Sequence, residues 1–341
     1  MKKQITRIAI FGKVIQAEFF SCFEQMLRDL KRRGICLSCY QPFYQFLGKH
    51  QVAVDVFSSF FDKESDLKEK VDILLSVGGD GTFLDSAVCV KDSGIPILGI
   101  NSGRLGFLAN IARAEIGEAI NMVCEGKFMI EQRDMVGLEM RNNPFLAFRY
   151  ALNEISILKT EHSSLLKIHA FVGEEYLTTY WADGVIVSTP TGSTAYSLSC
   201  GGPIVVPVCD NLMITPVCPH NLSMRPLVLA GKVRLRFRVE SRSGDFLLGL
   251  DSRVEKVSDN RELFISSGDF KLNIVKMPNH GYYDTLRNKL GWGEDLRNGI
   301  DRSILLSGRD EMKLPIVRYS FGLNLPFGSS VPGYTERRGR R

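Results

Sequence analysis

A glycine-rich loop contains the first residues in the chain whose types suggest chemistry. Residues 78–82 read Gly-Gly-Asp-Gly-Thr and follow the apolar run 71–77. Glycines directly after a buried strand let backbone N–H groups come close to an anion, whereas a side chain at these positions would block that approach. The sequence therefore predicts a phosphate-binding loop made of Gly78, Gly79, Gly81 and Thr82.

Asp80 is the residue of this loop that favours phosphoryl transfer. A carboxylate among phosphate-facing amides repels an anionic ligand unless it binds a metal, or accepts a proton or hydrogen bond from a hydroxyl group. Both roles occur in phosphoryl transfer. The alternative is a strand-ending turn in which Gly and Asp only satisfy the backbone.

A second run, residues 183–203, combines a short apolar strand at 185–187 with glycine and small hydroxylated residues. Residues 194–199 are expected to begin a helix whose free N–H groups favour a phosphate. Such a surface suits a nucleotide with phosphates and sugar hydroxyls, although a Ser/Thr-rich structural loop is the alternative. The hydroxyl groups come from Ser188, Thr189, Thr191, Ser193 and Thr194.

The segments around the first loop have the pattern of a parallel α/β sheet. A strand is predicted at 6–11, followed by a helix that Gly34 closes. Strands at 71–77 and 95–100, one helix length apart, place the glycine loop at the carboxyl edge of the sheet, where open sheets bind ligands. The apolar positions of the first helix are Phe19, Phe23, Met26, Leu27 and Leu30.

After about residue 112 the pattern changes to short alternating segments, which predict antiparallel strands. The fold class is thus α/β plus all-β, with an N-terminal open parallel α/β nucleotide-binding domain and a C-terminal antiparallel β-rich domain. The alternating segments are 148–158, 164–172, 233–239 and 263–265. The predicted domains are 1–112 completed by 276–298, then 113–275, with a poorly ordered tail at 299–341.

Charge and composition argue against two classes of partner. The net charge is +5, but residues 301–341 hold eight Lys/Arg and four Asp/Glu, so they supply +4 of it. The remaining chain is nearly neutral, which argues against a nucleic-acid partner. No apolar run approaches the roughly 20 residues that span a bilayer, so no membrane partner is expected.

The eight cysteines are scattered, and no signal peptide is recognisable at the amino terminus. A cytoplasmic protein with reduced thiols is expected. Cys36 and Cys39 form an isolated C-x-x-C without a second ligand pair at comparable spacing, so they are interpreted as core or surface thiols rather than a zinc site.

Five motifs together resemble the NAD kinase family in order and spacing: Gly78–Thr82, Asn101–Leu108 (Asn-Ser-Gly-Arg-Leu-Gly-Phe-Leu), Leu152–Ile155 (Leu-Asn-Glu-Ile), Asp183–Pro203, and Arg225-Pro226-Leu227. The resemblance extends from about residue 6 to about 297, and residues 284–293 resemble the Bacteroidetes-type branch. Residues 301–341 have no counterpart in that branch. The glycine loop also resembles lipid kinases and phosphofructokinases, so the run 183–203 is the discriminating motif.

The resemblance implies a kinase that transfers the terminal phosphoryl group of ATP to the 2'-hydroxyl of the adenosine ribose of NAD. Asp80 would be the catalytic base, and a divalent cation such as Mg²⁺ would arrive with ATP and not be held by the protein alone. The resemblance also implies a homodimer or homotetramer, in which residues 251–253 extend to the site of a neighbouring subunit. The implied NAD contacts are Asp80, Gly81, Asn153, Glu154, Asp183, Thr194, Ala195, Tyr196, Ser197, Leu198 and Ser199, with further positions at Ser164, Trp181, Arg253 and Phe107.

Two other functions are compatible with the same residues. A lipid or other small-molecule kinase on the same fold would phosphorylate a different alcohol. A non-catalytic sensor would bind NAD or NADP and change its oligomeric contacts. The intact Asp80 and glycine loop favour an enzyme over the sensor.

Overall fold

The computed structural model describes residues 5–52, 55–62, 67, 71–160, 164–278 and 280–292. All of them belong to one compact unit, Met1–Trp292. The tail predicted at 299–341 and the last residues predicted to complete the first domain, 293–298, lie outside the described residues.

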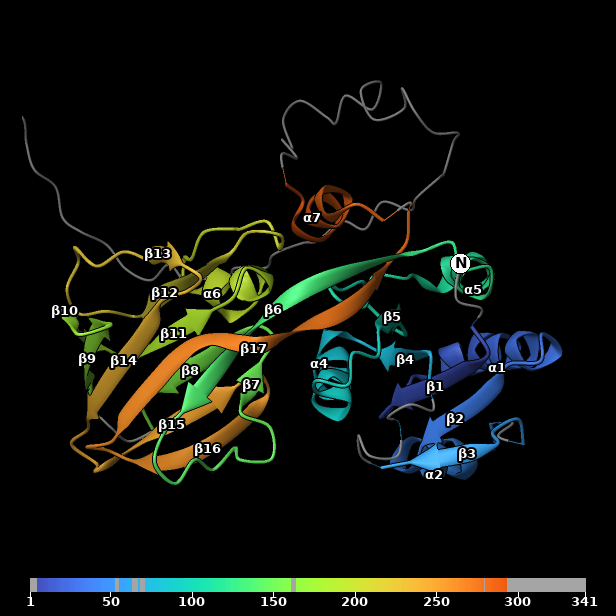
Figure 1. Ribbon diagram of the computed structural model, residues 1–341, viewed down its shortest axis with the longest axis horizontal. Helices are drawn as coiled ribbons and strands as arrows, with labels where there is room; N and C mark the ends of the chain where they lie inside the picture. The colour runs from blue at the N-terminus through green and yellow to red at the C-terminus, as the bar shows by residue number, and fades with distance from the viewer. Residues whose placement is uncertain are drawn as a thin grey trace, which may run out of the picture. The chain divides into compact units, whose positions relative to one another are not determined.

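Five parallel strands form the first part of the larger sheet, in the spatial order β5-β4-β1-β2-β3 (Figure 1). The predicted parallel sheet is therefore confirmed, and the glycine loop follows β4 at the carboxyl edge. The strands are β1 (Arg7–Gly12), β2 (Cys36–Tyr40), β3 (Ser59–Phe61), β4 (Ile73–Gly78) and β5 (Ile97–Asn101).

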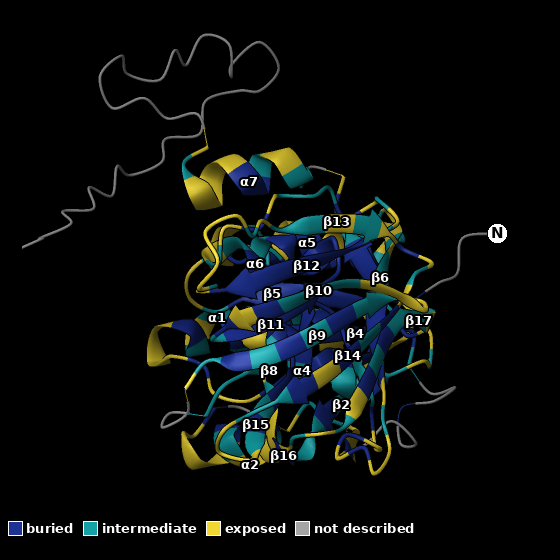
Figure 2. Ribbon diagram, turned by 90° about the vertical axis from the view of Figure 1, so that its left-hand side faces the viewer, coloured by how far each residue is buried: buried dark blue, intermediate teal, exposed yellow. Residues whose placement is uncertain are grey.

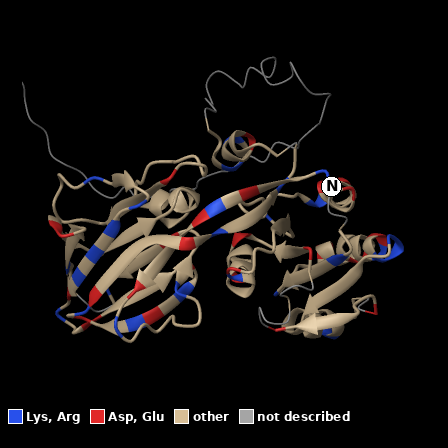
Figure 3. Cartoon of the chain, in the orientation of Figure 1, with Lys and Arg blue, Asp and Glu red and all other residues tan. Residues whose placement is uncertain are grey.

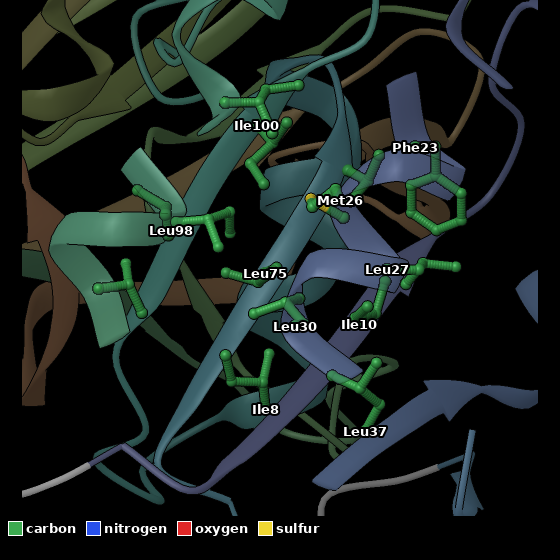
Figure 4. Packing of buried hydrophobic residues seen from close by; sticks show 14 of the residues in the cluster. Ile8, Ile10, Phe23, Met26, Leu27, Leu30, Leu37, Leu75, Leu98 and Ile100 are labelled. Atoms are coloured by element: carbon green, nitrogen blue, oxygen red, sulfur yellow. The ribbon is translucent and has the colours of Figure 1, made fainter. Parts of the chain in front are cut away.

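Helices cover both faces of these strands because the buried side chains of each strand alternate between two apolar clusters. Ile8 and Ile10 of β1 pack with the apolar stripe of α1 (Figure 4). Ala9 and Phe11 pack instead with α4. The helix predicted after β1 is confirmed, and Gly34 lies just beyond its end with φ 75°. The helices are α1 (Ala17–Arg32), α2 (Gln41–Lys49), α4 (Asp80–Val90) and α5 (Ile116–Cys124), with a short 3-10 helix η1 (Arg113–Glu115) before α5.

Two long strands, β6 (Met129–Glu139) and β17 (Glu262–Lys276), continue the same sheet out of its parallel part (Figure 1). Ile274 of β17 pairs in parallel with Ile97 of β5, and the other end of β17 pairs with β14 (Arg234–Glu240). The sequence indicated only 263–265 of this strand. One sheet thus contains strands of both predicted domains, 1–112 and 113–275. The domain boundaries remain predictions.

The remaining described strands pair in antiparallel fashion, as predicted. The larger sheet ends in β14, β9 and β10, and a six-stranded sheet packs against it through an apolar core that includes Ile157, Val187 and Phe237. Figure 2 shows β11 and β12 of that second sheet as buried. The strands are β7 (Tyr150–Ala151), β8 (Glu154–Leu158), β9 (Leu166–Val172), β10 (Glu175–Ala182), β11 (Gly184–Ser188), β12 (Asn211–Val217), β13 (Leu227–Ala230), β15 (Asp245–Leu250) and β16 (Arg253–Ser258).

Three short helical segments complete the described part: η2 (Thr191–Thr194), α6 (Tyr196–Ser199) and α7 (Tyr282–Leu290). Over the ranges given above, none of the helices combines the length and apolar character needed to span a bilayer.

Candidate active site

The glycine loop joins β4 to α4, which begins at Asp80. A Cβ atom on Gly78 would collide with the side chain of Thr82, so this glycine is required by the packing of the loop itself. A Cβ atom on Gly79 or Gly81 would meet no protein atom within 4 Å. The space beside these two glycines is therefore open, as the approach of a ligand requires.

Three backbone N–H groups bind the carboxylate of Asp80. Phe107 donates to Oδ2 at 2.9 Å, and Leu108 and Ala109 donate to Oδ1 at 3.0 and 2.9 Å. A Cβ atom on Gly106 would overlap this carboxylate, which explains the glycine in the Leu-Gly-Phe-Leu segment. The sequence placed Phe107 near NAD, but it did not reveal that this loop is anchored on Asp80.

Asn153 and Glu154 lie at the start of β8, where the carboxylate of Asp251 fixes their backbone. Its oxygens accept the N–H groups of Leu152 and Asn153 at 2.8 Å each and that of Glu154 at 3.2 Å. Asp251 itself has φ 51°, in the left-handed region. The sequence indicated Asp251 only as the first residue of the loop 251–253, in which Arg253 was the predicted NAD contact.

Glu154 has an unusual environment for a carboxyl group. The residue is 9% exposed, and its Oε2 is buried without a hydrogen-bond partner. Burial, followed by the charge of Asp251, raises the pKa of Glu154 to about 8, although a backbone hydrogen bond from Tyr196 acts in the opposite direction. Buried polar atoms are normally paired, so this oxygen marks a position where a polar ligand group can form a hydrogen bond with Glu154.

The discriminating run lies against Asn153. The carbonyl oxygen of Asn153 accepts the N–H of Thr189 at 2.9 Å, and a Cβ atom on Gly192 would collide with the same backbone. The hydroxyl of Thr189 donates to the carbonyl of Leu152 at 2.6 Å. The structure thus brings together two motifs that are well separated in the sequence.

The predicted helix over 194–199 is partly wrong. The 3-10 turn η2 ends at Thr194, and a separate single helical turn, α6, follows Ala195 and ends before Gly201, whose φ is 79°. Local hydroxyl contacts favour the break, since Ser193 both donates to the carbonyl and accepts the N–H of Val205 at 3.1 and 3.0 Å. Ala195 and Leu198 are partly buried here, Ser197 is buried, and Ser199 is exposed.

Asp183 and Tyr196 extend the surface around Glu154. The carboxylate of Asp183 pairs with the ammonium of Lys159 at 2.7 Å, and both side chains are about two-thirds buried. The ring of Tyr196 is 39% exposed and lies close enough to Glu154 and Asp183 for their charges to raise the pKa of its hydroxyl, after the larger effect of burial. Of the predicted NAD contacts, Asn153, Glu154 and Tyr196 are therefore neighbours.

No contact joins three of the further predicted NAD contacts, Trp181, Ser164 and Arg253, to Asn153 or Glu154 in the interactions described above. Trp181 is 47% exposed on β10 with the ammonium of Lys167 at 4.8 Å from its ring centre. Ser164 is exposed just before β9. The Arg253 guanidinium donates to the carbonyls of Phe148 and Tyr150 within its own chain, at 2.5 Å each. NAD contacts from these residues remain predictions.

A cavity of about 280 Å³ lies along α4, on the side of Asp85. Its wall contains the ammonium of Lys13, which pairs with the carboxylate of Asp85 at 2.6 Å. The complete lining is Phe11, Lys13, Tyr40, Asp62, Asp85, Val88, Cys89, Lys91 and Arg253. The short segment 251–253 therefore contributes to both places. Arg253 lines the cavity, and Asp251 binds the backbone of Asn153 and Glu154.

Metal-binding side chains do not gather in the part of the chain that the structure describes. None of its His, Cys, Asp and Glu residues form a group of three or more with metal-ligand geometry. The eight cysteines, all within the described ranges, carry free thiols.

Two family models match the chain. The ATP-NAD kinase N-terminal domain matches residues 24–128, and the ATP-NAD kinase C-terminal domain matches residues 152–277. An NAD kinase of Cytophaga hutchinsonii is 40% identical over 290 residues, which cover 85% of this chain and 99% of that protein. An NAD kinase of Bacteroides fragilis is 41% identical over 296 residues, with coverages of 85% and 99%.

Solved structures agree on the fold. Yeast NADH kinase complexed with NADH aligns with a TM-score of 0.77 at 23% identity, covering 87% of this chain and 91% of that one. An NAD kinase from Archaeoglobus fulgidus in complex with ATP aligns with a TM-score of 0.62 at 23% identity, covering 84% and 98%. The resemblance inferred from the motifs is confirmed, including its relation to Bacteroidetes proteins, and the chain belongs to the NAD kinase family of phosphotransferases.

Proposed function

We propose that the protein transfers the terminal phosphoryl group of ATP to the 2'-hydroxyl of the adenosine ribose of NAD, giving NADP and ADP. The observation that carries this proposal is the orphaned Oε2 of Glu154, buried next to Asn153 and the segment 189–196. Sugar hydroxyls are donors of the kind that this oxygen lacks. The family membership supports the same substrates.

The acceptor NAD would lie against Asn153, Glu154, Asp183 and the 194–199 segment. Asn153 can donate and accept, while the carboxyl groups of Glu154 and Asp183 accept from ribose hydroxyls. Tyr196 offers a partly exposed ring for stacking. A site built from such buried polar groups rejects analogues that lack the matching hydroxyls.

The donor would lie over the open side of Gly79 and Gly81. The cavity along α4 contains two cationic side chains, Lys13 and Arg253, and Lys13 pairs there with the carboxylate of Asp85. The donor is proposed to be the magnesium complex of ATP, with the cation carried by the phosphates.

Asp80 is proposed as the general base. The ribose oxygen forms a bond to the γ-phosphorus, the bond from that phosphorus to the β–γ bridging oxygen breaks, and the hydroxyl proton passes to the Asp80 carboxylate. The Oδ2 of Asp80 accepts only the N–H of Phe107, so this oxygen keeps a lone pair for the ribose hydroxyl and its proton. Positioning and charge neutralisation would supply most of the remaining acceleration.

One assay separates the proposal from its rivals. The full chain is incubated with NAD, ATP and Mg²⁺, and in parallel with a lipid alcohol in place of NAD. NADP formation supports the proposal, and a phosphorylated lipid without NADP supports a lipid kinase. Binding of NAD or NADP without turnover supports the sensor. A homodimer or homotetramer and a cytoplasmic location are part of the proposal, and light scattering and cell fractionation test them.

A further inference from the structure

Three charged side chains form a cluster where β6 and β17 run side by side. Figure 3 shows charged positions along these strands. Arg133 pairs with Glu131 at 2.5 Å, and Glu131 also pairs with Lys276 at 2.7 Å. The Arg133 and Glu131 side chains are only 13% and 15% exposed. None of the sequence motifs includes these residues, and the reaction proposed above does not use them.

Stability alone is a weak explanation for this cluster. Burial lowers the pKa of Arg133, with partial compensation from Glu131, and the Nε of Arg133 is buried without a partner. Replacing a buried ion pair by apolar residues is often neutral or stabilising, because desolvation offsets the attraction. The contacts of the Arg133 guanidinium therefore indicate the role of this residue better than the stability of the ion pairs does.

Arg133 contacts the loop that surrounds the proposed NAD site. Its Nη1 donates to the hydroxyl of Thr191 at 3.3 Å, and Thr191 is 6% exposed. Thr191 opens η2, and its carbonyl accepts the hydroxyl of Thr194 at 3.3 Å. Gly192, the next residue, packs against the backbone of Asn153.

The same arginine also borders the loop that holds Asp80. A cavity of about 30 Å³ has Arg133, Phe107 and Leu108 among the residues that line it. Phe107 and Leu108 donate two of the three backbone hydrogen bonds to Asp80. Arg133 thus forms a hydrogen bond with the segment 191–194 and shares a cavity with the loop that binds Asp80.

We propose that Arg133 is a positioning residue. Its hydrogen bond holds Thr191 at a fixed position relative to β6 and so fixes the 191–194 turn against Asn153. Its effect on NAD binding rests on the function proposed above, whereas its effect on the order of the turn does not. A substituted Arg133 leaves the Thr191 hydroxyl without its charged donor, and the turn loses the contact that links it to the long strands.

A double-mutant cycle on the full chain tests this coupling. The variants are Arg133→Met, Thr191→Val and the double substitution, with Thr191→Ser as the conservative variant that keeps the hydroxyl. Arg236→Met is the matched control, since Arg236 is 22% exposed, pairs with Glu262 and touches neither motif. NAD affinity is measured by calorimetry, and order in the turn by amide hydrogen exchange of the peptide 189–200 without ligand.

Arg133→Met and Thr191→Val should each weaken NAD binding about tenfold, as expected for loss of a hydrogen bond to a charged group. Each should also speed exchange in the peptide 189–200, the double variant should add nothing further, and Thr191→Ser and Arg236→Met should behave like the wild type. If Arg133→Met proves too unstable, Arg133→Lys, which keeps the charge but not the fork geometry, should show the same exchange pattern.

Additive effects of the two substitutions, or unchanged exchange in both single variants, would overturn the proposal. If the wild type does not bind or phosphorylate NAD, the proposed function fails, and the ligand-free exchange result still decides whether Arg133 positions the turn.

Discussion

The carboxylate of Asp251 accepts the backbone N–H of Asn153 at 2.8 Å, although 98 residues separate the two in the chain. With its further bonds to Leu152 and Glu154, it satisfies three donors at the entrance to β8. Burial raises the pKa of Asp251, and these backbone hydrogen bonds oppose that rise. The shape of the proposed NAD site therefore depends on a residue outside the motif that forms it.

Substituting Asp251 by Asn should destabilise the fold by about 1–3 kcal/mol, because the amide group turns a donor toward N–H groups that need an acceptor. Urea unfolding measures the change. Asp269→Asn is the control, since the Asp269 side chain is 76% exposed and its contacts to Arg149 and Tyr150 lie at the surface. Equal stability of the two variants would contradict the assigned role of Asp251.

Glu154 should make the free energy of unfolding depend on pH. Its pKa rises from 4.5 in the unfolded chain to about 8 in the fold, so between these values the folded state binds more protons than the unfolded state. Its contribution to stability is therefore fully present below about pH 4.5 and is lost as the pH rises toward 8.

Glu154→Gln removes this titration. The unfolding free energy of the variant minus that of the wild type should increase between pH 4.5 and 8, by an amount on the order of a few kcal/mol. Parallel stability curves for the two proteins over this range would show that Glu154 is not buried as described. Tyr180→Phe is a useful control, since burial raises the pKa of Tyr180 to about 12, outside this window.

Asp80→Asn should reduce turnover by about 10² to 10⁴ while sparing NAD affinity, as expected for removal of a general base. Because Asp80 also anchors residues 107–109, a second variant is needed to separate the two roles. Gly106→Ala forces the loop away from the carboxylate but keeps that carboxylate. Equal losses of turnover in both variants would identify Asp80 as an anchor only, and unchanged turnover in Asp80→Asn would exclude it as the base.

Two alanine substitutions in the glycine loop should have opposite signatures. Gly79→Ala places a methyl group where no protein atom lies within 4 Å, so the melting temperature should hold while the KM for ATP rises. Gly78→Ala collides with Thr82 and should lower the melting temperature instead. A normal KM for ATP in Gly79→Ala would argue against phosphates over this loop.

Much of the fold follows from local patterns. The apolar spacing of Phe19, Phe23 and Leu30 predicted α1, and alternation predicted β9 and β14, because a helix or strand with one buried face has that period. The length of β17 was not predictable in this way. Its pairing with β6 is interrupted between Ser267 and Lys271, and the irregularity breaks the alternation that a continuous strand would display.

The site was predictable where its residues adjoin one another in the sequence, as in the glycine loop and the Asn153–Glu154 pair. Asp251 and Arg133 were missed because their roles arise from contacts with residues 98 and 58 positions away, and no local spacing marks such contacts. Glu154 was identified as an acceptor, but its orphaned oxygen becomes visible only when burial is known.

Product analysis tests the central claim most directly. The full chain is mixed with NAD and the magnesium complex of ATP, and the products are followed by phosphorus NMR together with a dehydrogenase that accepts only NADP. The proposal predicts NADP with a phosphate on the 2'-hydroxyl and ADP in equal amount. A folded protein that yields no NADP with any of several phosphoryl donors and divalent cations would contradict it.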